Sequence, residues 1–252
     1  MICKNCGASA EGKYCNQCGQ KLGLGRMSMH ELAHDAWHGV THTDKGILKL
    51  LKDLTIRPRA FYQEYFSGKR KTYFNPVMFF LLMAGLVVLL YPFVFDYEDK
   101  ITHENNEFGR ILFHLAKYRV LALLPFQIGL TWLFYHKRFN LAEIIVFWLF
   151  VMGWLQALHV LIIPLYFPLI HHKSVIDNLY TIISFVLMVW QGLMFTQKIN
   201  LKNILSWLII VNIVYVIEYF FQVVLIFDWN FLQTNTEGWK SIWDVIKARY
   251  HW

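Results

Sequence analysis

The chain has 252 residues, of which 56% are apolar and only 16% are charged. Ordinary soluble domains contain about 45–50% apolar residues on a similar count. This balance excludes a disordered chain and argues against a single soluble globule. The formal net charge of +7 suits a nucleic-acid partner, an anionic membrane surface or the loops of a membrane protein.

The positions of the basic residues separate these explanations. Twelve Lys and Arg residues precede the first long apolar run, and the densest group lies just before Pro76: Lys69, Arg70 and Lys71. A basic group beside an apolar span is typical of a cytoplasmic flank that meets anionic lipid headgroups. We therefore expect a lipid bilayer as the main partner and do not expect nucleic acid.

All four cysteines lie within the first 18 residues, as two Cys-x-x-Cys pairs each followed by glycine: Cys3, Cys6, Cys15 and Cys18. Such a pair lets both thiolates reach one ion, and the glycine lets the backbone curl around the sulfur atoms. A disulfide needs an oxidising compartment, and a redox Cys-x-x-Cys normally occurs once in an α/β fold. The pattern therefore predicts a structural Zn²⁺ site in a minimal ribbon of one short hairpin, residues 1–24, with no open catalytic position.

Residues 25–74 are predicted to form cytoplasmic juxtamembrane amphipathic helices. Ser28 and Glu31 form a capping box that opens a helix, and three histidines follow at four-residue steps: His30, His34 and His38. Their shared face is either a second metal site or a polar stripe. Two further helices, near 47–54 and from Pro58, either lie on the inner leaflet or pack against the inner ends of the membrane spans.

Five segments within residues 75–227 are apolar enough to cross a hydrocarbon core of about 30 Å. The predicted spans are 75–95, 119–135, 141–163, 175–195 and 202–227, and apolar residues with helical spacing precede the second. Pro164 is expected to stop or kink the third helix, so residues 164–170 are predicted to be helical, interfacial or re-entrant. The predicted fold class is an all-α integral membrane bundle of about five transmembrane helices.

The basic residues also predict the orientation. With the N-terminus in the cytoplasm, the inner segments carry 16 Lys and Arg residues and the outer segments carry 8. An odd number of spans then places the C-terminus outside. Residues 228–252 are predicted to form an amphipathic helix, either at the membrane interface or packed on the loops of the bundle.

Polar side chains inside lipid are costly and usually face the interior of a bundle. The candidates in the third and fifth spans are Gln156, His159, Glu218 and Gln222. A contact between His159 and Glu218 would satisfy both groups. It would carry protons, bind a cation or lock two helices together, and of these we favour locking.

The order of several short motifs resembles a known family. Two Cys-x-x-Cys pairs and a histidine-bearing helix are followed by His42-Thr43-Asp44-Lys45-Gly46, Arg57-Pro58, Tyr65-x-x-Gly68-Lys69-Arg70 and Tyr73-Phe74-x-Pro76. Over residues 1–90 this order is similar to an uncharacterised bacterial family of zinc-ribbon, multi-pass membrane proteins of unknown function. The resemblance implies a location in the bacterial inner membrane, but no activity, substrate or catalytic residue.

The sequence contains no nucleophile elbow, zinc-protease motif or phosphate-binding glycine loop, so no catalytic residue is predicted. The favoured function is a membrane-tethered interaction or sensor platform whose zinc ribbon recruits a cytoplasmic protein. The alternative is a small oligomeric transporter or channel that uses His159 and Glu218. A membrane enzyme acting on lipid has weaker support, from His171, His172 and Asp177 at the outer surface.

Overall fold

A computed structural model describes residues 1–32, 46–102 and 107–234, and their side chains except for those of 107–120 and 221–234. Within these residues every regular element is a helix and no strand is present. The helices are α2 (Ile47–Ile56), α3 (Pro58–Ser67), α4 (Pro76–Leu90), α5 (Pro92–Thr102), α6 (Glu107–Tyr135), α7 (Leu141–Tyr166), the 3₁₀ helix η1 (Ile170–His172), α8 (Lys173–Thr196) and α9 (Leu201–Thr234).

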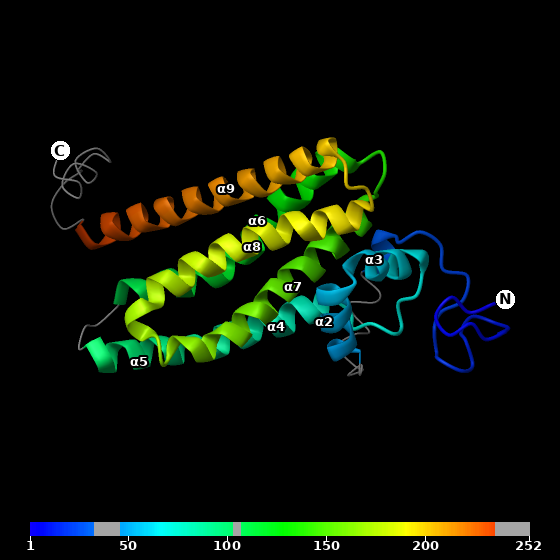
Figure 1. The fold of residues 1–252 in the computed structure, drawn as a ribbon, viewed down its shortest axis with the longest axis horizontal. Coiled ribbons are helices and arrows are strands. Elements are labelled where there is room, and N and C mark those ends of the chain that lie inside the picture. Colours follow the sequence, from blue (N-terminus) through cyan, green and yellow to red (C-terminus); the bar gives the residue numbers. More distant parts are fainter. Residues whose placement is uncertain (33–45, 103–106, 235–252) are drawn as a thin grey trace.

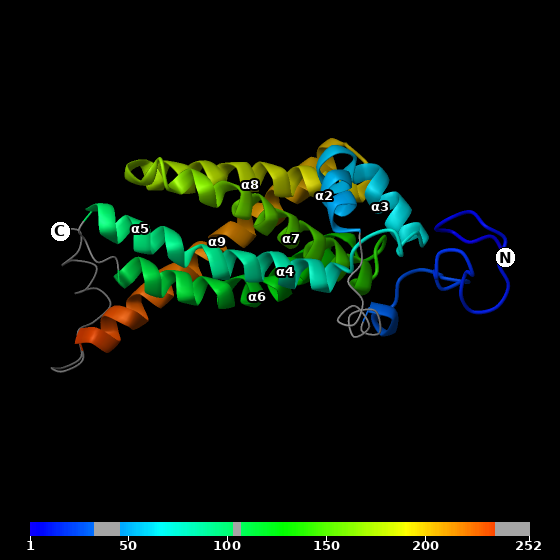
Figure 2. The ribbon, with the colours of Figure 1, turned by 90° about the horizontal axis from the view of Figure 1, so that it is seen from below.

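The long helices run lengthwise beside one another as a bundle (Figure 1). Helices α2 and α3 lie at one end of this bundle, and the N-terminal residues form a separate lobe beyond them. The last described turns of α9 lie at the opposite end, which the view from below also shows (Figure 2). The predicted all-α bundle is therefore confirmed for the described residues.

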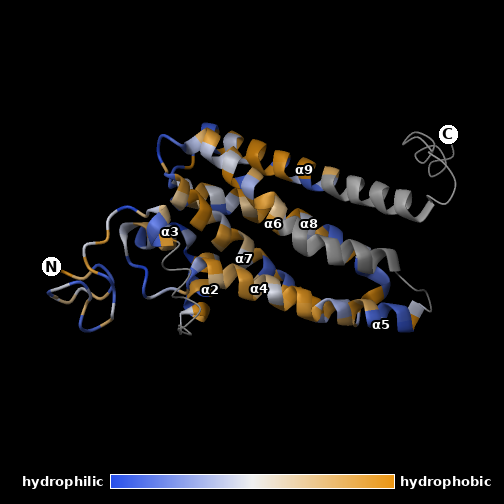
Figure 3. Cartoon of the chain, turned by 180° about the vertical axis from the view of Figure 1, so that it is seen from behind, coloured by the Kyte–Doolittle hydropathy of each residue, from blue (hydrophilic) through white to orange (hydrophobic). Residues whose placement is uncertain are grey.

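Four helical segments are long and apolar enough to cross a membrane: Pro76–Thr102, Leu141–Tyr166, Ile170–Thr196 and Leu201–Phe220. Within α6, the residues whose side chains are described form a shorter apolar helical segment, Leu121–Tyr135. Hydrophobic residues follow the bundle helices, whereas the N-terminal lobe is largely hydrophilic (Figure 3). These lengths indicate a multi-pass membrane protein.

Two helix ends differ from the sequence-based expectation. The first span does not end at residue 95, because Pro92 begins a second helix that continues to Thr102 and buries Val94 and Phe95. The third span does not stop at Pro164, because α7 includes this proline and ends two residues later, at Tyr166. The last turn of α7 persists because Tyr166 is fully buried and its hydroxyl donates to Asp177 of α8 at 2.5 Å. The helical spacing before the second span is explained by the 29-residue helix α6.

Helix α7 occupies the centre of the bundle. In its most apolar window 67% of the residues are buried, compared with 33% in each of the other three candidate spans. Its aromatic side chains contact rings from several neighbours: Phe147 stacks on Phe195 of α8 at 4.4 Å between ring centroids, and Phe150 meets Phe61 of α3 at 5.1 Å. The larger cluster of buried residues is therefore a packed aromatic layer that includes α2 and α3. A second cluster joins α4, α5 and the end of α7 and includes Tyr91 and Tyr166.

The contacts of α2 and α3 decide between their two predicted positions. Tyr62 of α3 donates to Gln191 of α8 at 2.8 Å, and Gln191 in turn donates to the carbonyl of Leu54 of α2 at 3.0 Å. Trp154 of α7 donates to Thr55 at 2.9 Å. These helices are thus packed against the bundle and do not lie as separate elements on the lipid. The boundary predicted between residues 227 and 228 is not observed, because α9 continues through it to Thr234. The rest of the predicted C-terminal amphipathic helix, residues 235–252, lies outside the described residues.

Close helix packing at Gly192 generates a testable prediction. A Cβ atom added there would lie 2.1 Å from Cδ2 of Trp207, a fully buried side chain of α9. We expect Gly192→Ala to destabilise the protein by about 1–3 kcal/mol, because overpacking a tight core forces strain. Thermal unfolding in detergent measures the effect.

The matched control is Gly85→Ala in α4, where an added Cβ meets nothing within 4 Å. This variant should unfold at the same temperature as the parent protein or slightly above it, because Ala has the higher helix propensity. Equal unfolding temperatures for both variants would contradict the packing of α8 on α9.

Candidate metal centre and its mounting on the bundle

Two turns in the N-terminal lobe, residues 1–24, share one hydrogen-bond pattern. In the first, the N–H of Cys3 donates to the carbonyl of Ala8 and the N–H of Gly7 donates to the carbonyl of Cys3, both at 2.9 Å. In the second turn, the N–H of Cys15 donates to the carbonyl of Gln20 and the N–H of Gly19 donates to the carbonyl of Cys15, both at 2.8 Å. The glycine after each pair has a positive φ, 77° at Gly7 and 70° at Gly19, which favours glycine.

The lobe therefore differs in detail from the single hairpin expected from the sequence. Each turn is closed by its own isolated antiparallel bridge, between Ile2 and Ser9 in the first and between Tyr14 and Lys21 in the second. A turn this small has room for one Cys-x-x-Cys pair and little apolar core. Two such turns facing each other bring the two pairs together.

The four sulfur atoms form one cluster. All lie within 4.8 Å of one another, and the Sγ atoms are 3.6 Å apart in both the Cys3–Cys18 and the Cys6–Cys15 pair. These distances exclude disulfide bonds, which need about 2.05 Å. In a regular tetrahedron, metal–sulfur bonds of about 2.3 Å would hold the sulfurs about 3.8 Å apart. The cysteines can therefore hold a metal ion with little rearrangement.

The backbone of the turns favours the thiolate form that a metal requires. The N–H of Cys6 points at the sulfur of Cys3 and lowers the pKa of that thiol to about 7. The N–H of Cys18 likewise lowers the pKa of Cys15. The pKa of Cys6, in contrast, is raised to about 12, because the hydrogen bond from the N–H of Ala8 is outweighed by burial and the three neighbouring thiols. Cys3 and Cys15 are therefore prepared as thiolates, the metal-binding form, whereas Cys6 would lose its proton when a cation binds.

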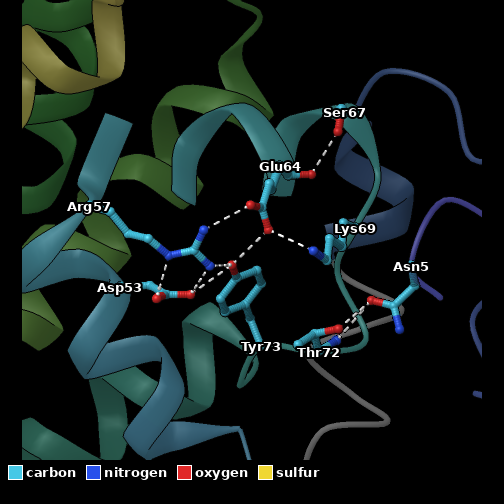
Figure 4. A network of polar contacts seen from close by, with 8 residues as sticks. All are labelled: Asn5, Asp53, Arg57, Glu64, Ser67, Lys69, Thr72 and Tyr73. Carbon is cyan, nitrogen blue, oxygen red and sulfur yellow. Dashed lines mark hydrogen bonds and ion pairs between the residues drawn. The ribbon is translucent and has the colours of Figure 1, made fainter. Parts of the chain in front are cut away.

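Side-chain hydrogen bonds join the lobe to the segment that leads into α4. Asn5 Oδ1 accepts from the backbone N–H of Thr72 at 3.2 Å and from its hydroxyl at 2.5 Å (Figure 4). Gln20 Oε1 accepts from the backbone N–H of Lys71 at 2.8 Å. Each turn thus contacts the same short segment, which we call the entry segment, residues 68–75.

The residues of the predicted basic cluster lie in this entry segment, and two of them form ion pairs within the chain. Lys69 bonds to Glu64 at 2.9 Å. Arg70 is only 8% exposed and bonds to Glu31 at 3.2 Å and to the carbonyl of Gly25 at 3.3 Å. The side chain of Lys71 is exposed. Lys69 and Arg70 therefore fasten the entry segment within the chain, and a position of the cluster at a membrane surface stays a prediction.

A second polar network ties α2 and α3 to the entry segment (Figure 4). Arg57 binds both carboxylate oxygens of Asp53 at 2.7 Å and one oxygen of Glu64 at 3.0 Å. The hydroxyl of Tyr73 lies 2.9 Å from Asp53 and 3.1 Å from Glu64, so it can donate to either carboxylate. Asp53 and Tyr73 are almost fully buried, and a buried charge needs such partners.

The network lowers the pKa of its two carboxyl groups, whereas the pKa of Tyr73 is raised. Hydrogen bonds from Arg57 lower the pKa of Asp53, and the bond from Lys69 lowers the pKa of Glu64. Burial is the main cause that raises the pKa of Tyr73. Both carboxyl groups therefore remain ionised at neutral pH, where they hold the network together.

The linker after the lobe is fixed to the start of α7. Arg26 binds both carboxylate oxygens of Glu143, at 2.8 and 2.7 Å, and Asn140 donates to the carbonyl of Met27 at 2.7 Å. The side chain of Glu143 is only 6% exposed. It also completes the capping box of α7 with Asn140, in which each residue bonds to the backbone of the other. One carboxylate thus caps α7 and holds the linker.

The histidine face is only partly described. Ser28 and Glu31 form the predicted capping box, with Glu31 N–H to Ser28 Oγ at 3.2 Å and Ser28 N–H to Glu31 Oε2 at 3.4 Å. His30 follows on the surface of this first helical turn. His34 and His38 lie outside the described residues, so a metal site on this face stays a prediction.

The intramembrane candidates lie on α7 and α9. The ring of His159 stacks on Tyr180 at 4.7 Å and meets Tyr91 edge-on at 5.4 Å. Its Nε2 atom is buried and has no hydrogen-bond partner in the described part of the chain, so it does not bond to Glu218 there. Gln156 and Glu218 are half-buried. The side chain of Gln222 lies outside the described set.

Sequence reasoning missed the buried carboxylates of Asp53 and Glu143 and the half-buried carboxylate of Glu64. For Glu143 a local signal was present, because Asn140 three residues earlier makes a capping box readable. Asp53 and Arg57 are also four residues apart on one helix, the spacing of an ion pair. The partnership with Tyr73 had no such signal, since it depends on how the chain returns after α3.

Comparison with known proteins adds a family of unknown function. Residues 44–88 match the family model described as "Protein of unknown function (DUF3667)". The matched range contains α2, α3, the entry segment and most of α4, and therefore the whole network around Asp53. Searches of curated proteins and of solved structures found no match to this chain.

The network predicts acid sensitivity. Because the pKa values of Asp53 and Glu64 are lowered in the folded state, their stabilisation is complete above about pH 5 and is lost as the pH falls through the folded pKa values. We expect Asp53→Asn to destabilise the protein at pH 7 by about 1–3 kcal/mol, the usual cost of an unsatisfied buried polar partner. Its stability should also fall less steeply than that of the parent below about pH 4.

Unfolding temperatures in detergent from pH 7 to pH 3 measure both effects. Glu11→Gln is the control, because Glu11 is an exposed acid in the lobe and its removal should change neither the stability nor its pH dependence. Equal acid-induced losses in the Asp53→Asn variant and the parent would refute the role of this carboxylate.

Proposed function

We propose that this chain is a bacterial inner-membrane platform that holds a zinc-bound ribbon, residues 1–24, at the cytoplasmic surface to recruit a protein partner. The observation that carries this proposal is the rigid mounting of the ribbon. Its two turns bond to the entry segment, and its linker bonds to the buried Glu143 of α7. A ribbon that served only as a loose tether would need no such fixed orientation.

Zinc is the metal that best suits the four thiolates. Cys₄ sites with tetrahedral spacing are typical of structural Zn²⁺, and four protein ligands leave no place for a reacting water. The lobe has only a small buried cluster around Cys3, Ala10 and Cys15. Metal binding would therefore supply much of its folding free energy.

The proposed topology has five spans, with α6 as the span added to the four long candidates. Helices α4, α6, α7, α8 and α9 then alternate in direction, which is supported by the position of α9's last described turns opposite the N-terminal lobe (Figure 1). The loops at the lobe end carry basic residues: Lys137, Arg138 and Lys198. The positive-inside rule places this end in the cytoplasm and the C-terminus outside.

The surface of the ribbon offers a feature suited to a protein partner. Ile2 and Tyr14 are 76% and 55% exposed, although both are large apolar side chains. They occupy equivalent positions in the two turns, each directly before a cysteine. The exposed Lys13 and Lys21 lie beside Tyr14. Apolar side chains flanked by cations fit a partner with an apolar patch and an acidic rim.

The transporter or channel alternative has one observation in its favour. The buried Nε2 atom of His159 lacks a hydrogen-bond partner among the described residues, and an unsatisfied polar group inside lipid is often functional. Against this, rings occupy the space around it: Tyr91 and Tyr180 contact His159 directly. The aromatic core of the bundle also leaves α7 closely packed. We therefore favour the platform.

The metal assignment predicts the effect of losing one ligand. The parent protein should contain about one zinc per chain by elemental mass spectrometry, and Cys6→Ser should reduce this ratio to near zero. Hydrogen–deuterium exchange at the backbone N–H groups of Lys71 and Thr72 should then accelerate at least tenfold, because Gln20 and Asn5 would no longer be held against them. Tyr14→Ser is the control that should keep both the zinc and the slow exchange. A different metal, or unchanged exchange in Cys6→Ser, would contradict this assignment.

Recruitment is tested by photo-crosslinking in living cells. A photoreactive amino acid in place of Tyr14 should give a discrete crosslinked product with a soluble cytoplasmic protein. The same residue in place of Ile182, an exposed side chain of α8 in a candidate span, should give none. Adding Cys6→Ser should abolish the product, because the ribbon would unfold. A product that survives in the Cys6→Ser background, or the lack of any product at position 14, would exclude the proposed role.

A further inference from the structure

One face of α9 is exposed over the residues whose side chains are described, 201–220. Leu205, Ile209, Val216 and Tyr219 are 49%, 46%, 61% and 68% exposed. Together with Asn212 they are spaced by alternating steps of four and three residues. This is the spacing of a seam along which two helices pack with interlocking side chains. The opposite face of α9 packs within the chain, through Trp207, Ile210, Val211 and Val214, all at most 1% exposed.

Asn212 lies at the centre of the exposed face. It is eleven residues from Leu201, or roughly 16 Å along the helix, which is about half the thickness of a hydrocarbon core. The residue is exposed, and no hydrogen bond to its side chain is found among the described residues. Beside it lies a groove between α8 and α9 lined otherwise by Phe185, Leu205, Leu208, Ile209 and Ile213. An amide that faces lipid tails at this depth is costly unless another polar group meets it.

We infer that this face of α9 binds a second copy of the chain, with the Asn212 side chains of the two copies paired across a twofold axis. A carboxamide carries both a donor and an acceptor, so two identical amides satisfy each other in a symmetric interface. The apolar residues on either side would pack between the helices and remove the amide pair from lipid. A single Asn among apolar seam residues also fixes helix register and oligomeric state in coiled coils.

The neighbouring helix provides a contrast within the same protein. The exposed face of α8 consists mainly of apolar residues: Val175, Leu179, Ile182 and Val186. It also carries an exposed amide, Asn178, but this residue lies only five residues, or roughly 8 Å, from the start of α8 at Lys173. Headgroups and water reach an amide at that depth, whereas they do not reach Asn212 near the middle of the hydrocarbon core. The amide of Asn212 therefore distinguishes α9 as the dimerisation helix. This inference does not depend on the ribbon or on the proposed cytoplasmic partner.

The test measures association of the full-length protein in lipid. Two batches of purified protein carry donor or acceptor fluorophores on a C-terminal tag and are mixed in phosphatidylcholine vesicles at increasing lipid-to-protein ratios. We expect energy transfer that is lost on dilution with lipid. Asn212→Leu should weaken the dimer by roughly tenfold, because interhelical polar hydrogen bonds contribute about 1–2 kcal/mol in membranes.

Two further variants make the test specific. Asn212→Gln retains the amide and should preserve more of the association than Asn212→Leu. Ile182→Leu on the exposed face of α8 should leave the dimer unchanged. A parent protein that is monomeric at every lipid ratio, as expected if Asn212 meets another protein or lipid alone, overturns the inference. Equal association of the parent and Asn212→Leu overturns it as well.

Discussion

The structure depends on the buried carboxylate of Asp53. This group lies where α2, α3 and the entry segment meet, and it can remain ionised there only because Arg57 and Tyr73 bond to it. Asp53 lies in α2, Arg57 lies at the junction between α2 and α3, and Tyr73 lies in the entry segment, so satisfying this one charge fixes the relative positions of the three segments. Gly46, just before α2, strengthens this arrangement. An added Cβ there would lie 2.7 Å from the carbonyl oxygen of Thr72, so only glycine allows this close approach.

The same segments connect the candidate metal centre to the bundle. The entry segment bonds to Asp53 and Glu64 on one side and to the cysteine lobe on the other, through Tyr73 and Thr72 respectively. It then continues into α4, which begins where Asn75 accepts bonds from the first backbone N–H groups of the helix. A change in the lobe would therefore act first on the start of a membrane helix. Because the lobe is bonded to the segment that begins α4, this arrangement is compatible both with a fixed platform and with a sensor that passes a change in the lobe to the membrane helix.

Local patterns allowed the sequence to predict the cysteine cluster, the capping box at Ser28 and the apolar helices, because each depends on spacing within one short segment. The position of α2 and α3 could not be predicted in the same way. An amphipathic pattern shows that one face is buried, but it does not distinguish lipid from protein as the cover. The structure identifies protein as the cover, because Gln191 of α8 bonds both to Tyr62 of α3 and to the carbonyl of Leu54 of α2. Likewise, the ion pairs of Lys69 with Glu64 and of Arg70 with Glu31 could not be predicted, because they depend on how the chain returns after α3.

The two faces of α9 show how lipid changes the interpretation of a helix. In water, both its buried face at Trp207 and its exposed face at Ile209 would require a cover, because both are apolar. In a bilayer the lipid tails cover Ile209 without cost, so exposure of apolar side chains carries no information about partners. A polar side chain on the lipid-facing surface does indicate a partner, because lipid tails cannot form hydrogen bonds with it. Asn212 is therefore more informative than the larger apolar surface around it, and it points to a second copy of the chain because an amide is complementary to itself.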